Sequence, residues 1–372
     1  MIRLLRLSNF KCFKNQQLDL APLTLLSGLN GTGKSSVLQS LLLLRQSYYQ
    51  GLLQNRGLAL NGDLVRIGMA RDALYEGAEE ERITFNVAWV GGNEAQWIFN
   101  YNRAADVLDI VSPQASAEVF EESLFGDDFQ YLQAERIGPR TAFETSDNLV
   151  RQHKQLGTRG QYTAHFLSMF ERDEIPHKEL AHSEVDSLKL RDQVEAWMGE
   201  VSPGTRLHIN THAGLDLVSL EYSFVSGSHT SNNYRSTNVG FGITYTLPII
   251  VAILSARSDA LLMIENPEAH LHPKGQVRMG HLISLAAQCG VQILVETHSD
   301  HVLNGIRLAV HEGQLPPEKV QLYFFDRPMT AEPAHKVVSP AINRDGRIDR
   351  WPNNFFDEWD KSLEVLLQPT GE

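Results

Sequence analysis

The chain has 372 residues, more than a single hydrophobic core usually spans, so two lobes or a core with a large insertion are expected. Its 33 basic and 45 acidic residues give a formal net charge of −12, which disfavours a general nucleic-acid coat or an anionic membrane as the main partner. The cysteines, Cys12 and Cys289, are typical of a reducing cytosol and exclude a metal cluster built on cysteines. No apolar stretch is long enough to cross a bilayer and the N-terminus lacks a signal-peptide core, so a cytoplasmic location is predicted.

The first part of the chain contains a phosphate-binding pattern. Segment 28–36, GLNGTGKSS, fits G-x-x-x-x-G-K-[ST], and it lies between an apolar stretch at 22–26, a predicted strand, and an apolar run that begins at Val37, a predicted helix. Strand, loop and helix in this order are the context that the pattern requires. Lys34 is expected to reach the β- and γ-phosphates of ATP, and the Ser35 hydroxyl to bind Mg²⁺. The predicted nucleotide contacts in this loop are Asn30, Gly31, Thr32, Gly33, Lys34, Ser35 and Ser36.

The character of the sequence changes between residues 51 and 233. Strands are predicted at 83–90, 96–101, 107–111, 129–134, 207–209 and 217–224, and helices at 162–170 and 186–198. No heptad pattern is sustained, so no long coiled coil is expected. The polar segment 226–236 closes this part of the chain, which we interpret as an inserted α+β lobe.

A second glycine-rich turn follows the lobe. Segment 237–242, TNVGFG, opens a predicted apolar helix at 243–254. The N-terminus of a helix attracts anions, so this turn is a second anion-binding feature, although a glycine pair before a helix is a common pattern.

Polar side chains then follow two predicted buried strands. The apolar run 260–264 ends in Glu265, with Glu268 close behind, and the run 291–295 continues into ETHSD, which contains His298. The carboxyl ends of parallel strands meet at one edge of an open sheet, where α/β proteins bind ligands. We therefore expect the phosphate loop, the acid pair and His298 to lie together.

The order of these motifs resembles that of ATP-binding-cassette ATPases of the RecF and SMC type, within the AAA class. More closely, it is similar to a prokaryotic family of predicted ATPases with a short C-terminal domain of unknown function. L-x-N-F-K-x-F at 7–13, the phosphate loop, the 237–242 turn, H-L-H-P and T-H-S-D match in order, and 346–357, GRIDRWPNNFFD, resembles the C-terminal domain.

The resemblance implies an α/β fold, a P-loop NTPase of the ABC type with a mixed central sheet and helices on both faces. The head would be discontinuous and consist of residues 1–50 and 234–330. An inserted α+β lobe would occupy 51–233, and a small C-terminal appendage would occupy 331–372.

The same resemblance implies roles for single residues. Two heads would sandwich two ATP molecules, with Asn238, Gly240 and Gly242 of one head capping the γ-phosphate held by the other. His298 would contact the γ-phosphate, and Glu265 would hold Mg²⁺ through water. The usual catalytic carboxylate is replaced by Asn266, so Glu268 is the nearest candidate to orient the attacking water.

Several interpretations stay open at this stage. Arg136 and Arg140 could be ion-paired surface residues or phosphate sensors, with Glu135 paired to one of them. His270, His272 and His298 could form a zinc site, but their spacing favours structural histidines at the nucleotide edge.

The predicted function is an ATP-binding and ATP-hydrolysing switch. It would form a homodimer on ATP and control a separate effector, such as a nuclease, in DNA repair or antiviral defence. The alternatives are a nucleotide-binding structural or sensor module with negligible turnover, and a nuclease-associated ATPase that acts directly on DNA. A transporter subunit would need a standard signature turn and the usual catalytic pair.

Overall fold

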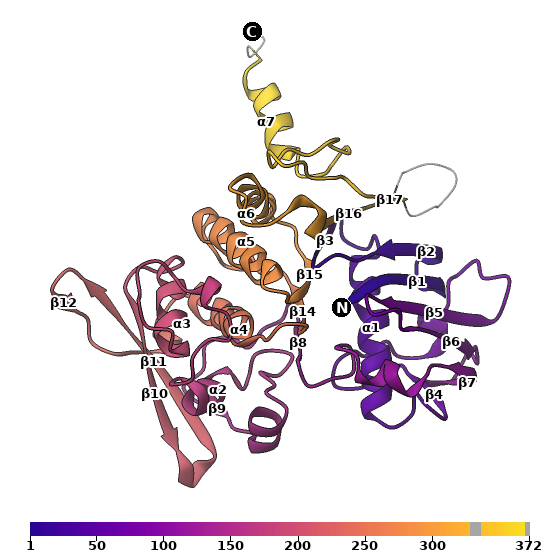
Figure 1. Cartoon of the computed structure of the whole chain (residues 1–372), viewed down its shortest axis with the longest axis horizontal. Helices are drawn as coiled ribbons and strands as arrows, with labels where there is room; N and C mark the ends of the chain where they lie inside the picture. Colours follow the sequence, from indigo (N-terminus) through magenta and orange to yellow (C-terminus); the bar gives the residue numbers. More distant parts are fainter. Residues whose placement is uncertain (328–335, 369–372) are drawn as a thin grey trace.

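The structure is a computed structural model that describes residues 1–327 and 336–368. Near the N-terminus an antiparallel sheet has the strand order β2-β1-β5-β6-β7-β4 (Figure 1). Its strands are β1 (Ile2–Phe10), β2 (Phe13–Asp19), β4 (Gly57–Ala59), β5 (Arg82–Trp89), β6 (Glu94–Asn100) and β7 (Val107–Gln114). Polar and apolar residues alternate along β5 and β6, because one face of this sheet is buried and the other is not.

The central sheet has the order β17-β16-β3-β15-β14-β8. Its parallel strands are β3 (Leu23–Gly28), β8 (Phe129–Leu132), β14 (Leu261–Glu265), β15 (Gln292–Glu296) and β16 (Val320–Asp326). The edge strand β17 (Lys336–Val338) pairs antiparallel with β16. The sheet is therefore mixed, as the resemblance to ATP-binding-cassette ATPases implied.

Both faces of the central sheet are covered. On one face lies α1 (Lys34–Tyr49), between the two sheets; on the other lie α4 (Phe241–Ser255), α5 (Pro273–Gln288) and α6 (Asp300–His311) (Figure 1). Along β14, Leu261 and Met263 belong to the core with α1, whereas Leu262 and Ile264 belong to the core with α4 to α6. Burial on both sides explains why these strands read as continuous apolar runs. The expected α/β fold with helices on both faces is confirmed.

A lobe stands beside the head at the left of Figure 1. It contains β9 (Phe143–Glu144), α2 (Thr163–Phe170), α3 (Leu190–Gly199), β10 (Thr205–His212), β11 (Leu217–Ser226), β12 (His229–Thr230) and β13 (Tyr234–Arg235). Two strands of the segment expected to form the inserted lobe pair with strands at the ends of the chain: β5 pairs with β1, and β8 pairs with β14. Strands between residues 57 and 132 thus complete the sheets of the head, and the part that lies outside both head sheets runs from residue 133 to the start of α4.

The C-terminal segment packs on the head through its aromatic residues. Phe355 is fully buried, and its ring centroid lies 5.4 Å from that of Phe324 in β16. The final helix, α7 (Glu358–Leu366), extends away from the head and exposes Trp359 and Leu366 (Figure 1). Among the described residues, no helix is both long and apolar enough to cross a membrane.

Candidate nucleotide-binding site

The phosphate-loop lysine is buried at the carboxyl end of β3. Lys34 Nζ donates hydrogen bonds to the carbonyl oxygens of Gly28, at 2.9 Å, and Leu29, at 2.8 Å. Its side chain is only 3 % exposed, and this burial lowers the pKa of the ammonium group. The phosphate loop therefore surrounds the Lys34 ammonium group, and its positive charge and the backbone N–H groups of the loop can together bind an anion.

The tight loop depends on Gly33, which precedes the first residue of α1. Its φ of 111° lies in the region that favours glycine. A Cβ at this position would lie 2.6 Å from both Cys12 Sγ and Phe13 Cζ. The L-x-N-F-K-x-F segment, residues 7–13, therefore packs directly against the phosphate loop. Both of its phenylalanines, Phe10 and Phe13, are buried core residues.

Glu296, at the end of β15, is the acid that contacts the loop. Its Oε1 accepts a hydrogen bond from Ser35 Oγ at 3.1 Å and lies 3.9 Å from Lys34 Nζ. Burial and the neighbouring Glu265 carboxylate raise the pKa of Glu296 to about 7, although Lys34 and Ser35 act in the opposite direction. Its other oxygen, Oε2, is buried and has no hydrogen-bond partner among the described residues.

Glu265 lies beside Glu296, because the two residues are paired in register at the ends of β14 and β15. Its carboxylate accepts hydrogen bonds from the Tyr131 hydroxyl at 2.9 Å and from the Ala134 N–H at 3.0 Å. Burial, together with this carboxylate, raises the pKa of Tyr131. The carboxylate of Glu265 is therefore held in place by β8 and the segment that follows it.

Arg136 fixes the backbone at this edge of the sheet. Its guanidinium donates to the carbonyl oxygens of Glu265 and Asn266, both at 2.6 Å, and it is only 1 % exposed. Burial lowers the pKa of Arg136 to about 10. Its burial contradicts the first interpretation, a surface ion pair, and phosphate sensing stays a prediction. Glu135 pairs instead with Arg159, at 2.9 Å.

Glu268 and His298 lie side by side. Glu268 accepts hydrogen bonds from the Thr297 hydroxyl at 2.7 Å and from the His298 N–H at 2.8 Å. The His298 ring is exposed, and its pKa is lowered by partial burial and by the nearby Lys34 ammonium. The structure thus brings Lys34, Ser35 and His298 to the same sheet edge as three acids. This is the arrangement expected from the strand ends.

The acidic part of this edge fits a magnesium ion. Mg²⁺ prefers hard oxygen ligands and is commonly held by one or two carboxylates together with phosphate oxygens. Ser35 Oγ and Glu296 Oε1 are already in contact, and Glu296 Oε2 is a buried acceptor without a partner. A cation would remove the cost of that unpaired atom and the repulsion between Glu296 and Glu265.

The remaining loop residues lie where the motif predicts. Asn30 and Gly31 are exposed at the tip of the loop, and the Thr32 hydroxyl donates to the Leu29 carbonyl at 2.7 Å. Ser36, in the first turn of α1, is buried and forms a side-chain hydrogen bond with Cys12.

The second glycine-rich turn lies on the surface. Asn238 and Gly240 are exposed and border an open hollow of about 540 Å³, together with His270 and His272. Gly242 has a packing role, because a Cβ there would lie 2.6 Å from the carbonyl oxygen of His270. A glycine at this position is therefore required by the fold of this chain, whether or not a ligand binds.

The histidines of the H-L-H-P segment have structural roles. The His270 ring lies 4.8 Å from that of Tyr245 in α4, and His272 Nδ1 accepts from the Lys274 N–H at the start of α5. Among the described residues, the group of side chains close enough together to bind one metal ion consists of His177, Glu179 and Cys289, and it includes neither His270 nor His272.

Sequence reasoning missed Glu296 and Tyr131 as parts of the site, and it did not predict that Arg136 holds the backbone at residues 265 and 266. For Glu296 a signal was present, since it ends a buried strand just as Glu265 does. For Arg136 and Tyr131 the sequence offers no such pattern, because their roles arise from the pairing of β8 with β14.

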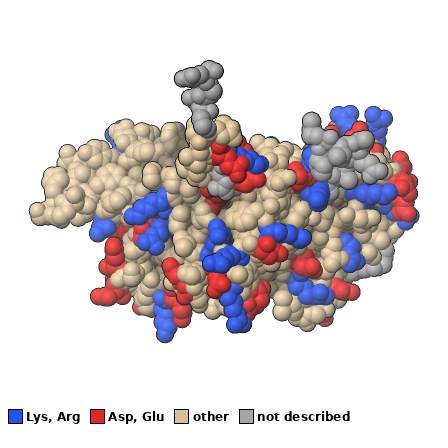
Figure 2. Space-filling model, turned by 90° about the horizontal axis from the view of Figure 1, so that it is seen from above, with Lys and Arg blue, Asp and Glu red and all other residues tan. Residues whose placement is uncertain are grey.

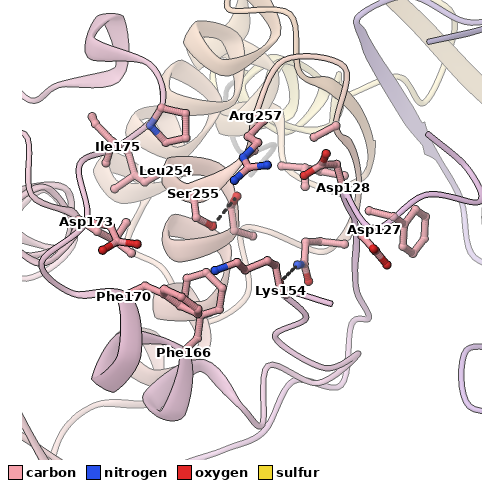
Figure 3. Close-up of a pocket in the computed structure, with 18 of the residues that line it drawn as sticks. Asp127, Asp128, Lys154, Phe166, Phe170, Asp173, Ile175, Leu254, Ser255 and Arg257 are labelled. Carbon is pink, nitrogen blue, oxygen red and sulfur yellow. Dashed lines mark hydrogen bonds between the residues drawn. The ribbon is translucent and has the colours of Figure 1, made fainter. Parts of the chain in front are cut away.

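A separate pocket of about 140 Å³ lies between the lobe and the head. Figure 3 shows the residues that line it. Lys154 lies over the ring of Phe170, with Nζ 3.3 Å from the ring centroid. Asp128 and Ala260, which line the pocket, immediately precede β8 and β14. The pocket is therefore at the opposite end of these strands from the phosphate loop, and it is no part of the candidate site.

Comparison with known structures identifies the same fold. The SMC head bound to the C-winged helix domain of ScpA aligns with a TM-score of 0.57 and 15% identity, over 92% of this chain and 98% of that chain. The Pyrococcus furiosus Smc head with an extended coiled coil, bound to the C-terminal domain of ScpA, aligns with a TM-score of 0.52 and 13% identity, over 99% of both chains. At these identities the similarity establishes the fold alone.

Sequence comparison gives the family. Residues 315–366 match a domain described as "Protein of unknown function (DUF3696)", and residues 23–304 match "AAA domain, putative AbiEii toxin, Type IV TA system". No curated protein matches the chain. The second domain match covers well over half of the 372 residues and contains the phosphate loop, the strand-end acids and His298. The chain therefore belongs to this AAA-domain family of P-loop ATPases, with the fold of an SMC head.

Proposed function

We propose that this protein is a Mg²⁺-dependent ATP hydrolase that acts as a switch, closes as a homodimer around ATP, and controls a separate effector protein. The observation that carries the proposal is the contact of Lys34 and Ser35 with Glu296. It combines a buried cation, a hydroxyl and a buried acid with one unpaired oxygen at the end of the phosphate loop.

The residues of the chain have distinct tasks in this proposal. Lys34 exchanges its two carbonyl partners for phosphate oxygens, while the loop N–H groups hold the anion. Ser35 and Glu296 hold Mg²⁺, with Glu265 beside them, and the bound ion would neutralise charge that develops on the phosphates. Glu268, held by the His298 N–H, orients the attacking water, and His298 faces the γ-phosphate.

The sandwich accounts for the exposed turn. Asn238 and Gly240 lie at the surface before the N-terminus of α4, so they can face a second molecule. In a symmetric dimer the turn of each protomer would cover the γ-phosphate in the other. The effector is then controlled by opening and closing of the dimer, in antiviral defence or in DNA repair. The family description, which names a putative AbiEii toxin of type IV toxin–antitoxin systems, supports a defence setting.

The surface gives less support to direct action on DNA. The net charge is −12, and Figure 2 shows basic and acidic side chains interspersed over the face in view. Electrostatic binding to a duplex favours a basic stripe or patch.

Phosphate release from ATP, measured with and without Mg²⁺, tests the hydrolase. We expect steady release that requires Mg²⁺ and disappears when Lys34 is replaced by alanine. Tight ATP binding without any release would instead identify a nucleotide-binding module with negligible turnover.

A further inference from the structure

The lobe contacts α5 of the head at both ends of this helix. Near the start of this helix, Glu200 at the end of α3 lies 3.3 Å from Arg278 Nε and 3.8 Å from Lys274 Nζ. At the other end of α5, Cys289 follows the last helical residue, and the lobe turn η4 (Lys178–Leu180) packs against the helix. One end of α5 thus contacts the lobe through ion pairs, and the other end contacts it through packing against η4.

Three potential metal ligands meet at the Cys289 end. His177, Glu179 and Cys289 bring a ring nitrogen, a carboxylate oxygen and a sulfur within 4.8 Å of one another. His177 and Cys289 are half-buried and Glu179 is exposed. His177 Nε2 is buried without a hydrogen-bond partner among the described residues, which is costly for a polar atom.

We propose that His177, Glu179 and Cys289 bind Zn²⁺ and thereby clamp the lobe onto the end of α5. Imidazole, thiolate and carboxylate are the three side-chain ligand types of zinc, and three protein ligands with water in the fourth position make an open tetrahedral site. With zinc bonds of about 2.0–2.3 Å, the donor atoms of such a site lie roughly 3.3–3.6 Å apart. The exposed Glu179 can rotate to close the remaining gap.

The electrostatics around the cluster suit a dication. The carboxylate of Glu179 and the thiolate of Cys289 would supply two negative charges, and the carbonyl end of α5 adds a partial negative charge. Burial, followed by the nearby Glu179, raises the pKa of the Cys289 thiol. Zinc binding would release the proton of this thiol to solvent as the S–Zn bond forms. Lys319, which bonds to Gln288 at 3.0 Å, is a nearby positive charge that opposes the ion.

Titration of the metal-free full-length chain with Co²⁺ tests the site. Co²⁺ is a spectroscopic substitute for Zn²⁺ and gives a near-ultraviolet charge-transfer band only when a thiolate binds it. We expect this band to saturate at one Co²⁺ per chain and to disappear on addition of Zn²⁺. The magnesium site at the phosphate loop has no thiolate and therefore does not contribute to the signal.

Matched variants assign the signal. Cys289→Ser should abolish the band, Cys12→Ser should leave it unchanged, and Glu179→Gln should weaken Co²⁺ binding roughly 10-fold or more. Glu179 is exposed, so its variant decides the question if Cys289→Ser does not fold. No band in the natural chain, a band that survives in Cys289→Ser, or unchanged affinity in Glu179→Gln would overturn the proposal.

Discussion

The carboxyl edge of the central sheet and the turn before α4 are built in different ways. At the sheet edge, Lys34 and Glu296 are buried, and both Lys34 and Ser35 contact Glu296. At the turn, Asn238 and Gly240 are exposed to solvent. Gly242, in the same turn, packs so closely against the carbonyl oxygen of His270 that a side chain would not fit.

This difference separates what one chain can do from what needs two. The sheet edge can bind a nucleotide within a single protomer, since its cation, hydroxyl and acids are all in place. The turn faces outward, so its contribution to the nucleotide is expected from a partner protomer. Substitutions at the two places should therefore affect binding and assembly separately.

The largest effect is expected from Lys34→Ala. The loop then loses a buried ammonium group, and charge-assisted hydrogen bonds are individually worth about 1.5–3 kcal/mol, so ATP affinity should fall roughly 10- to 100-fold. Equilibrium titration with ATP measures the change. The fold should survive, so the thermal midpoint without nucleotide should stay near that of the natural chain. Unchanged affinity would remove the phosphate loop from the account.

Glu268→Gln should trap bound ATP. The amide can still accept the His298 N–H bond but is a poor base, so turnover should fall about 10-fold or more while binding persists. Single-turnover hydrolysis beside an ATP titration separates the two quantities. Glu265→Gln is the matched control, and the roles of the two acids are reversed if it stops turnover with binding intact while Glu268→Gln does not.

Glu296→Gln should give a smaller, pH-dependent effect on stability. The pKa of Glu296 is raised to about 7, so the folded state holds this proton more tightly than the unfolded state does. That contribution to stability is present at acidic pH and is lost as the pH rises through about 7. The variant, which cannot ionise, should melt a few degrees above the natural chain at alkaline pH, and the difference should shrink toward acidic pH. Thermal melts without Mg²⁺ or nucleotide would refute the account if this difference were independent of pH.

The sequence could predict the parts of the site that depend on local pattern. The phosphate loop is a contiguous motif, and an apolar run that ends in an acid identifies Glu265 at a strand end. The same reasoning would have found Glu296, but the adjacent T-H-S-D motif directed the interpretation to His298. Neighbouring strand ends in register bring the two acids together, and the order of the strands is not encoded locally.

The pairing of strands that are far apart in the chain could not be predicted from the sequence. Segment 82–100 reads as a pair of alternating strands, and nothing in it specifies β1 as its partner. The sequence could not predict the burial of Arg136 for the same reason, since two of its acceptors, the carbonyl oxygens of Glu265 and Asn266, lie about 130 positions further along the chain. How the chain divides into domains, and which residues act on the nucleotide, stay predictions.

Gly240→Asp isolates the turn from the sheet edge. A Cβ at Gly240 meets no atom within 4 Å, so the substitution fits the isolated chain, whereas Gly242→Asp would disturb the packing on His270. In the closed dimer the new carboxylate would face the γ-phosphate of the partner's nucleotide and repel it. Gly91→Asp, at another open position in the turn between β5 and β6, is the matched control.

Light scattering with Mg²⁺ and a non-hydrolysable ATP analogue tests the central claim most directly. We predict that the natural chain and Gly91→Asp double in mass on addition of the analogue, or tighten a dimer that already exists. Gly240→Asp should bind the analogue and keep the mass of a monomer, or fail to tighten. The ATP sandwich would be contradicted if the natural chain binds the analogue yet remains monomeric. It would also be contradicted if the chain forms a dimer whose dissociation constant changes neither with the analogue nor with Gly240→Asp.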